Sequence, residues 1–327
     1  MPNRIVALIE WIGGQGTRAV VAVLFLGLAL PPLSAIMRPL LPLAVFVLFI
    51  LAFTRVDTAA VAMRVRRPRL ALLATVWMML AMPIAFAGGL ALLEPLDIPD
   101  ELAAGLVLMA VAPPIMSSPA FTYLLGLDGA LSVTVLVASM IVTPITAPIL
   151  VDVLIGEWVG LSARDLAIRL ALLLAGSFIA ALAVRRWLGE ARIAANGRLI
   201  DGLNILILFV FAVAIMDGVI AYAIRDPLLI LAILALAFAV NLLLLTVSAI
   251  AFLLFGIGSS LTVGIANANR NMGLMAAVMA GAVPEVTWLF FALAQFPIFL
   301  MPQLTRPAIL ALLARYNRAD DAGPQSN

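Results

Sequence analysis

The segment NANRN, residues 267–271, places three asparagines and one arginine inside an otherwise apolar stretch of the chain. The guanidinium of Arg270 carries N–H donors in a planar fork, which suits carboxylate, sulfate and phosphate groups. Asn267, Asn269 and Asn271 are spaced two residues apart, so on a regular helix they would point in three directions. We therefore predict an unwound segment whose amides satisfy freed backbone groups and contact a substrate. The alternative is that the amides hold one helix against another.

A second polar interruption is PPIMSSP, residues 113–119. Proline has no backbone N–H, so its presence breaks or kinks a helix. We expect Ser117, Ser118 and Thr122 to line a substrate cavity beside this break. The alternative is a kinked but continuous helix, in which these hydroxyls bond back to the preceding turn.

The chain has no histidine and no cysteine. Their absence excludes disulfides, thiol nucleophiles, imidazole bases and the usual zinc sites. The apolar stretches also offer no pair of carboxylates for acid–base work. We therefore expect a protein that is not an enzyme and that needs no cofactor and no metal.

The composition indicates a membrane protein. Of the 327 residues, 65% are hydrophobic and only 11% are charged, and the mean hydropathy is +1.21. The apolar residues form long runs of Leu, Ala, Val and Ile, which favour spanning helices over the alternating strands of a barrel. We predict an all-α membrane protein whose surroundings are the lipid bilayer.

About 20 apolar residues cross a bilayer. Windows of that length, cut at charges, prolines and glycines, predict ten transmembrane helices. They are 16–35, 39–55, 69–91, 102–125, 130–154, 164–184, 201–223, 228–256, 259–282 and 286–312.

The charged residues predict the orientation. All 19 basic residues are arginine, and they concentrate in segments 55–69, 185–198 and 306–318. The positive-inside rule then places both termini in the cytoplasm, in a multi-pass protein of the cell (inner) membrane. The net charge of +2 reflects this topology and gives no reason to expect nucleic acid as a partner. The oligomeric state stays open.

The helix breaks repeat at one offset along the chain. Ser118 and Asn271 are 153 positions apart, as are Pro144 and Pro297. Because five spans per half is an odd number, the second half must be inverted in the membrane. Two broken helices at matching positions of inverted halves point to a substrate site where they meet. The predicted units are a first repeat at 1–156, a second repeat at 157–316 and a disordered tail at 317–327.

Three stretches resemble the bile acid:sodium symporter superfamily, a family of ten-helix secondary transporters. The resemblance implies a panel domain (spans 1, 2, 6 and 7) and a core domain (spans 3–5 and 8–10). It also implies that discontinuous helices 4 and 9 cross, and that organic anions are moved by alternating access. The stretches are LAFTRVDTAAVAMRVRRPRLALLATVWMMLAMP (51–83), LVLMAVAPPIMSSPAFTYLLGLDGALSVTVLVASMIVTPITAPIL (106–150) and LTVGIANANRNMGLMAAVM (261–279).

The chain departs from this family at its sodium ligands. Apolar or cationic residues stand where sodium-coupled members carry oxygen ligands, and Ser118-Pro119 replaces the usual Ser-Asn. Ser132 keeps a ligand position, and Asn271 matches the family's asparagine. The replaced ligand positions are Ala266 for Glu, Arg270 for Gln, Leu136 for Thr and Met78 for Gln. This pattern argues against sodium symport at the two usual sites.

Arg270 itself allows three explanations. A charge near the bilayer centre costs about 2.5–3.5 kcal/mol on insertion scales, so it indicates function. The guanidinium could pair with Asp217 of span 201–223, or could be structural support held by the asparagines. We favour the third explanation, a fixed cation in the place of sodium that also binds an anionic substrate. Asp217 is in addition a candidate proton carrier.

The predicted function is secondary transport of organic anions, either bile-acid-like amphipaths or small organic acids, without sodium at the usual sites. One alternative is a membrane receptor that binds lipid or anion and has lost transport. Another is a conventional sodium symporter with rearranged ligands.

Overall fold

The computed structural model describes residues 4–56, 68–92, 98–156 and 160–321. Over these residues the chain is helical, apart from turns and one isolated backbone bridge. The predicted all-α class is therefore confirmed. Arg64, Arg66 and Arg67 of the arginine-rich segment 55–69 lie outside the described residues.

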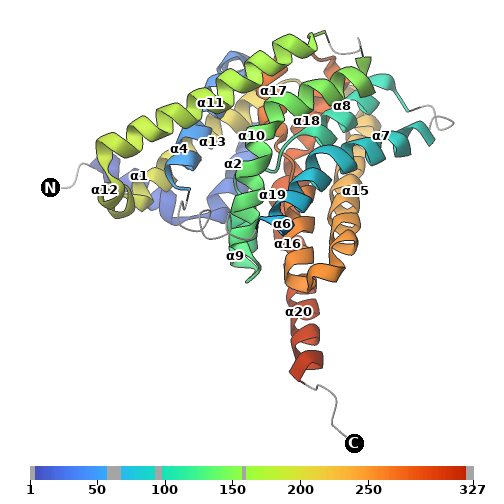
Figure 1. Ribbon diagram of the computed structural model, residues 1–327. Helices are drawn as coiled ribbons and strands as arrows, with labels where there is room; N and C mark the ends of the chain where they lie inside the picture. Colours follow the sequence, from blue (N-terminus) through green and yellow to red (C-terminus); the bar gives the residue numbers. More distant parts are fainter. Residues whose placement is uncertain (1–3, 57–67, 93–97, 157–159, 322–327) are drawn as a thin grey trace, which may run out of the picture.

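The helices form one elongated bundle from which the last helix projects (Figure 1). Those before residue 157 are α1 (Arg4–Gly14), α2 (Thr17–Leu28), α3 (Pro31–Met37), η1 (Arg38–Leu40), α4 (Leu41–Thr54), α6 (Arg69–Val76), η2 (Trp77–Ala81), α7 (Met82–Leu92), α8 (Asp100–Val111), α9 (Ser118–Leu124) and α10 (Gly129–Leu154). Those after residue 159 are α11 (Ala163–Leu188), α12 (Glu190–Ala195), α13 (Gly197–Ile215), α14 (Val219–Arg225), α15 (Pro227–Ala251), η5 (Leu253–Phe255), α16 (Ile257–Ala268), α17 (Met272–Val278), α18 (Glu285–Leu293), α19 (Gln295–Leu304) and α20 (Arg306–Asp321).

Seven stretches of the described chain are long and apolar enough to cross a membrane, or up to eight if α1 and α2 count as one bent span. The chain is therefore a multi-pass membrane protein. Three of the ten predicted spans are absent from the seven. Span 16–35 corresponds to α2, which belongs to the bent pair, and spans 102–125 and 259–282 each contain two shorter helices, α8 with α9 and α16 with α17. The seven are Pro31–Thr54, Arg69–Leu92, Gly129–Leu154, Ala163–Leu188, Gly197–Arg225, Pro227–Ala251 and Glu285–Tyr316.

The first predicted boundary lies elsewhere in the structure. The sequence predicts spans at 16–35 and 39–55, whereas the helix break falls at Ala29–Leu30 and one stretch runs from Pro31 to Thr54. Proline is well suited to the first position of a helix because its φ is already helical and its missing N–H is not needed there. Arg38 interrupts the hydropathy, but its side chain does not interrupt the helix.

The predicted tail is partly helical. α20 continues to Asp321, five residues into the segment 317–327, and residues 322–327 lie outside the described part of the chain. Figure 1 shows α20 extending away from the rest of the bundle.

The helices form two packed sets. In the first set, residues 4–54 and 163–225, α13 packs against α1, α2, α3 and α4, and α11 packs along α4. In the second set, residues 69–154 and 227–321, α15 packs against α16, α18 and α19, while α8 packs against α18. The sets meet where α17 contacts α4, α11 and α13, where α10 contacts α11, and where α19 contacts α2.

The outer surface of the bundle is apolar. On α10, Ile141, Ile145, Ile149 and Val153 are all exposed. Their four-residue spacing places them on one face of the helix. An exposed apolar stripe of this kind is what a lipid-facing helix presents.

Candidate functional site

Two linkers between helices contact each other directly. The Ile115 N–H donates to the Asn269 carbonyl oxygen at 2.7 Å, and the Asn271 N–H donates to the Pro113 carbonyl oxygen at 2.7 Å. Pro113 and Pro114 have no N–H with which to continue α8. The second linker instead pairs with the Pro113 carbonyl and the Ile115 N–H, which lie beyond the end of that helix. The two polar interruptions of the sequence thus form one unit. We call residues 112–117 and 269–271 the linker crossing.

Arg270 lies at the linker crossing and is completely buried. Its Nη1 donates to the Ala112 carbonyl oxygen at 2.7 Å, and its Nη2 donates to the Met78 carbonyl oxygen at 3.0 Å. Nη2 also donates to the side-chain oxygen of Asn267. All three acceptors are uncharged, so dipoles rather than a carboxylate hold the positive charge.

Both carbonyl acceptors are free for a local reason. Ala112 closes α8 with an extended backbone (ψ 145°), so its carbonyl leaves the helix. Trp77–Ala81 is a π-helical turn in which the Met82 N–H donates to the Trp77 carbonyl. In the same pattern, the Met78 carbonyl would accept from the N–H of residue 83, five positions later. That residue is Pro83, which has no N–H. The guanidinium therefore satisfies two backbone oxygens that have lost their helical donors.

The position suits a cation. Ala112 is the C-cap of α8, and Asn269, directly before Arg270, is the C-cap of α16. The C-terminal end of a helix carries roughly half a negative charge. Two such ends therefore meet near the guanidinium and stabilise it without an anionic residue.

The asparagines bind protein groups in this structure. Asn267 donates to the Ser248 hydroxyl at 2.7 Å, and Asn269 donates to the Ile265 carbonyl at 2.9 Å. The Asn271 side-chain oxygen accepts from the Leu274 N–H at 2.9 Å and so caps α17. The predicted satisfaction of freed backbone groups is confirmed for Asn271.

The predicted hydroxyls lie on and beside the same linker. Thr122 bonds back to the Pro119 carbonyl at 2.8 Å, which is the alternative that the sequence allowed for it. The Ser118 and Ser132 hydroxyl oxygens are 3.5 Å apart. Among the described residues, the Ser117 hydroxyl, the Asn269 side-chain oxygen and the Arg270 Nε are buried without a hydrogen-bond partner.

A profile of the sodium bile acid symporter family matches residues 42–224, more than half of the chain. The chain belongs to the sodium bile acid symporter family. Its members are transporters rather than enzymes. A search of curated proteins finds no match. The matched residues include α8, α9 and α10 but end before α16, so Arg270 lies outside them.

The structure shows what occupies the positions where the family resemblance places sodium ligands. The Met78 and Ala266 side chains pack into one buried apolar cluster, and Leu136 is buried in another. Methyl and thioether groups offer sodium no oxygen. The oxygens that the Arg270 guanidinium binds come instead from two backbone carbonyls and the Asn267 amide.

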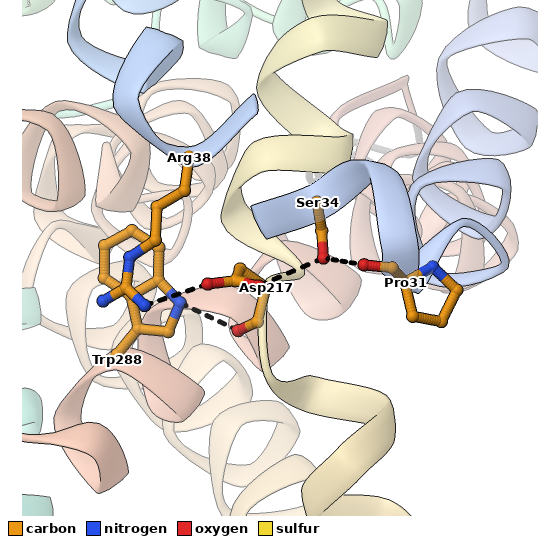
Figure 2. Close-up of polar contacts among 5 residues, drawn as sticks. All are labelled: Pro31, Ser34, Arg38, Asp217 and Trp288. Atoms are coloured by element: carbon orange, nitrogen blue, oxygen red, sulfur yellow. Dashed lines mark hydrogen bonds and ion pairs between the residues drawn. The ribbon is translucent and has the colours of Figure 1, made fainter. Parts of the chain in front are cut away.

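Asp217 does not pair with Arg270. Its carboxylate accepts from Arg38 Nη1 at 2.9 Å and from the Ser34 hydroxyl at 3.2 Å (Figure 2). The Asp217 carbonyl oxygen accepts from the Trp288 indole N–H at 3.2 Å. The ion-pair explanation for Arg270 is therefore wrong, because both partners are bound elsewhere.

A cavity of about 820 Å³ opens where α2 and α9 face the α19–α20 junction. Its cations are Arg18 and Arg306, and Gln15 and Gln303 add amides. α9 leads from the linker crossing to this cavity, since it begins at Ser118 and its later residues form part of the wall. The apolar wall includes Val21, Ala22, Phe121, Leu124, Leu125 and Pro302.

The two cavity arginines were not among the predicted site residues. One local feature could have identified them, namely their position at helix N-termini. Arg18 lies in the first turn of α2, and Arg306 is the first residue of α20. A cation is unfavourable near a helix N-terminus. Helix stability therefore does not explain these two residues, although the positive-inside rule accounts for their charge.

Proposed function

We propose that the protein is a secondary transporter that moves organic anions by alternating access, with Arg270 in place of a sodium ion. The observation that carries the proposal is the buried guanidinium bound to the carbonyls of Ala112 and Met78 at 2.7 and 3.0 Å. In sodium-coupled relatives a metal ion is expected near this crossing. A tethered cation supplies the same positive charge permanently.

The proposed architecture is a ten-span, five-plus-five inverted repeat. α8 with α9 is the fourth span and α16 with α17 the ninth, each discontinuous at the linker crossing. The first packed set of helices is the panel domain and the second set is the core domain. The direct bonds between the two linkers support this assignment, since inverted-repeat transporters place their substrate sites where broken helices meet.

The cavity is the proposed route for substrate. In the predicted orientation it opens to the cytoplasm, because Arg18 and Arg306 lie at the predicted inner ends of their spans. A volume of about 820 Å³ with largely apolar walls is much larger than a small organic acid needs. We therefore propose an amphipathic substrate, with an apolar body against Phe121 and Leu125 and an acidic group near the arginines.

At the linker crossing, the proposed binding residues are those predicted from the sequence. At the linker crossing, the Arg270 Nε and the Ser117 hydroxyl are buried donors without a hydrogen-bond partner. Both can donate to a carboxylate, sulfate or sulfonate that reaches the crossing after a conformational change. The surrounding polar side chains are Asn267, Asn269, Asn271, Ser118 and Thr122.

Flux through reconstituted vesicles tests the proposal. Purified protein is placed in proteoliposomes, and uptake of a steroid carboxylate and of a short dicarboxylate is measured in sodium chloride and in choline chloride. We expect saturable uptake of the amphipath that is equal in the two salts. A strong, saturable sodium requirement would contradict the fixed-cation role, and it would favour a sodium symporter with rearranged ligands.

Two further arms separate the remaining alternatives. Varying the pH gradient independently of sodium tests proton coupling, for which Asp217 is the candidate residue. Counterflow with substrate-loaded vesicles tests transport itself. Saturable binding without counterflow would favour a receptor that retains the fold.

A further inference from the structure

We infer that Arg38, Asp217 and Trp288 form a latch that closes the bundle at the end opposite the cavity and opens during the transport cycle. The inference rests on the proposed function in one respect, because a latch of this kind requires a protein that changes conformation. Its geometry is independent of the substrate. We use the name latch for these three residues.

The latch is a closed set of contacts (Figure 2). Arg38 Nη1 lies 2.9 Å from the Asp217 carboxylate, and the Arg38 guanidinium carbon lies 4.3 Å from the centre of the Trp288 ring. The Trp288 indole N–H donates to the Asp217 carbonyl at 3.2 Å. Each residue thus contacts the other two through an ion pair, a cation–π contact and a hydrogen bond.

The contacts join the two packed sets of helices. Arg38 lies on η1, and Asp217 lies between α13 and α14, so both belong to the first set. Trp288 lies on α18 of the second set. Because Gly218 has a positive φ of 83°, the helix breaks beside Asp217 and leaves its carbonyl free to accept from Trp288. The local break is therefore what allows the contact between the sets.

Other polar contacts close the same end. The Tyr222 hydroxyl bonds to the Glu285 carboxylate, which also joins the first set to the second. Arg169 Nη1 donates to the Val278 carbonyl at 2.9 Å and joins α11 to α17. These contacts and the latch lie toward the predicted outer ends of their helices.

The cavity lies at the other end of the same helices. Trp288 and Pro302 lie on one long stretch, Glu285–Tyr316, and are 14 positions apart. At 1.5 Å per residue this separation is about 21 Å. Polar contacts therefore close one end while a cavity opens the other, which is the arrangement of an inward-facing transporter.

The contacts are also of a kind that can open. The Arg38 side chain is 43% exposed, so water can solvate its guanidinium when Trp288 moves away with the second set. A cation–π contact at such an exposed site holds two surfaces only weakly. The latch can therefore bias the equilibrium between the two conformations without locking it.

A single cysteine reports on opening at this end, since the natural chain has none. Ala277 is buried on α17, four residues after Gly273, where an added Cβ would lie 2.9 Å from Phe211 of α13. Positions four apart share a helix face, so Ala277 faces the first set. In A277C, the rate of reaction with a membrane-impermeant maleimide added from outside measures how often the sets separate.

The test compares A277C alone with A277C carrying R38Q or W288F. We expect each latch variant to raise the labelling rate from outside about tenfold, the change that 1.4 kcal/mol produces in an equilibrium. R225Q is the matched control. Arg225 lies at the same end but contacts Tyr222 of its own helix, so its labelling rate should equal that of A277C alone.

Rates for the two latch variants equal to that of R225Q would overturn the inference. If one variant is missing from the membrane, the other decides, because R38Q removes the cation–π contact and W288F removes the indole hydrogen bond. Labelling needs neither substrate nor sodium. A negative labelling result would therefore leave the proposed anion transport untouched, and a negative flux assay would leave the labelling result valid.

Discussion

The Arg270 guanidinium donates to the carbonyl oxygen of Ala112, 158 positions earlier in the chain, at 2.7 Å. The bond joins the residue that ends α8 to the residue that follows α16. The Arg270 side chain lies in the break after α16, and it satisfies a carbonyl that is left free by the break after α8. This relationship leads to the first two predictions.

Replacing Arg270 with Met should destabilise the protein. The change leaves the Ala112 and Met78 carbonyls and the Asn267 oxygen without their donor, and each buried polar group left unsatisfied costs about 1–3 kcal/mol. We expect the free energy of unfolding to fall by about 3 kcal/mol or more. Thermal unfolding in detergent measures it. The exposed Arg225→Met is the control and should stay within about 0.5 kcal/mol; equal effects of the two changes would contradict the structural role of Arg270.

Exchanging the cation for an anion should create a sodium requirement. Arg270→Gln alone should abolish uptake, since it removes the positive charge at the crossing. Adding Ala266→Glu to it restores a carboxylate at a position where the family resemblance places a sodium ligand. We expect uptake by the double variant only in sodium-containing buffer. Uptake by the double variant that is unaffected by sodium would show that the charge at position 270 does not substitute for the metal.

Removing either cavity arginine should weaken substrate affinity. Arg18→Gln and Arg306→Gln each take one cation from the cavity wall. Exposed charges contribute on the order of 1 kcal/mol at most, so the apparent affinity for an anionic amphipath should fall by up to about fivefold. The loss should shrink at high salt because screening already weakens the charges. Arg315→Gln, on the exposed part of α20, is the control, and an equal loss there would point to general surface charge.

Replacing Gly273 with Ala should disturb the contact between α17 and α13. The added Cβ would lie 2.9 Å from Phe211 Cε2 and 3.0 Å from Cζ, so the ring must move. Overpacking of this kind costs about 1–3 kcal/mol, and we expect a matching fall in the free energy of unfolding. Gly88 on α7 is the control, because a Cβ there meets no atom within 4 Å. A neutral Gly273→Ala would mean that the two helices are not packed this closely.

The sequence by itself determined that this protein lies in a lipid bilayer, and it determined the places where the helices break. Hydropathy and composition identify membrane helices without any contact between them, because lipid selects apolar residues one span at a time. Two local features mark the breaks. The prolines at 113 and 114 cannot donate a helical hydrogen bond, and the polar side chains of NANRN are costly in lipid. The family resemblance also lay in the residues, and the match over 42–224 confirms it.

Only the tertiary structure decided how these parts are paired. Asp217 binds Arg38, 179 positions away, and not Arg270, although depth in the membrane allowed either partner. The π-helical turn at Trp77–Ala81 frees a carbonyl for Arg270, and the cavity collects Arg18 and Arg306 from opposite ends of the chain. Charge, hydropathy and helix propensity are properties of short segments, whereas a hydrogen-bond partner depends on which distant segments pack together. That packing is a balance of many weak contacts spread over the whole chain, and no single stretch of residues contains it.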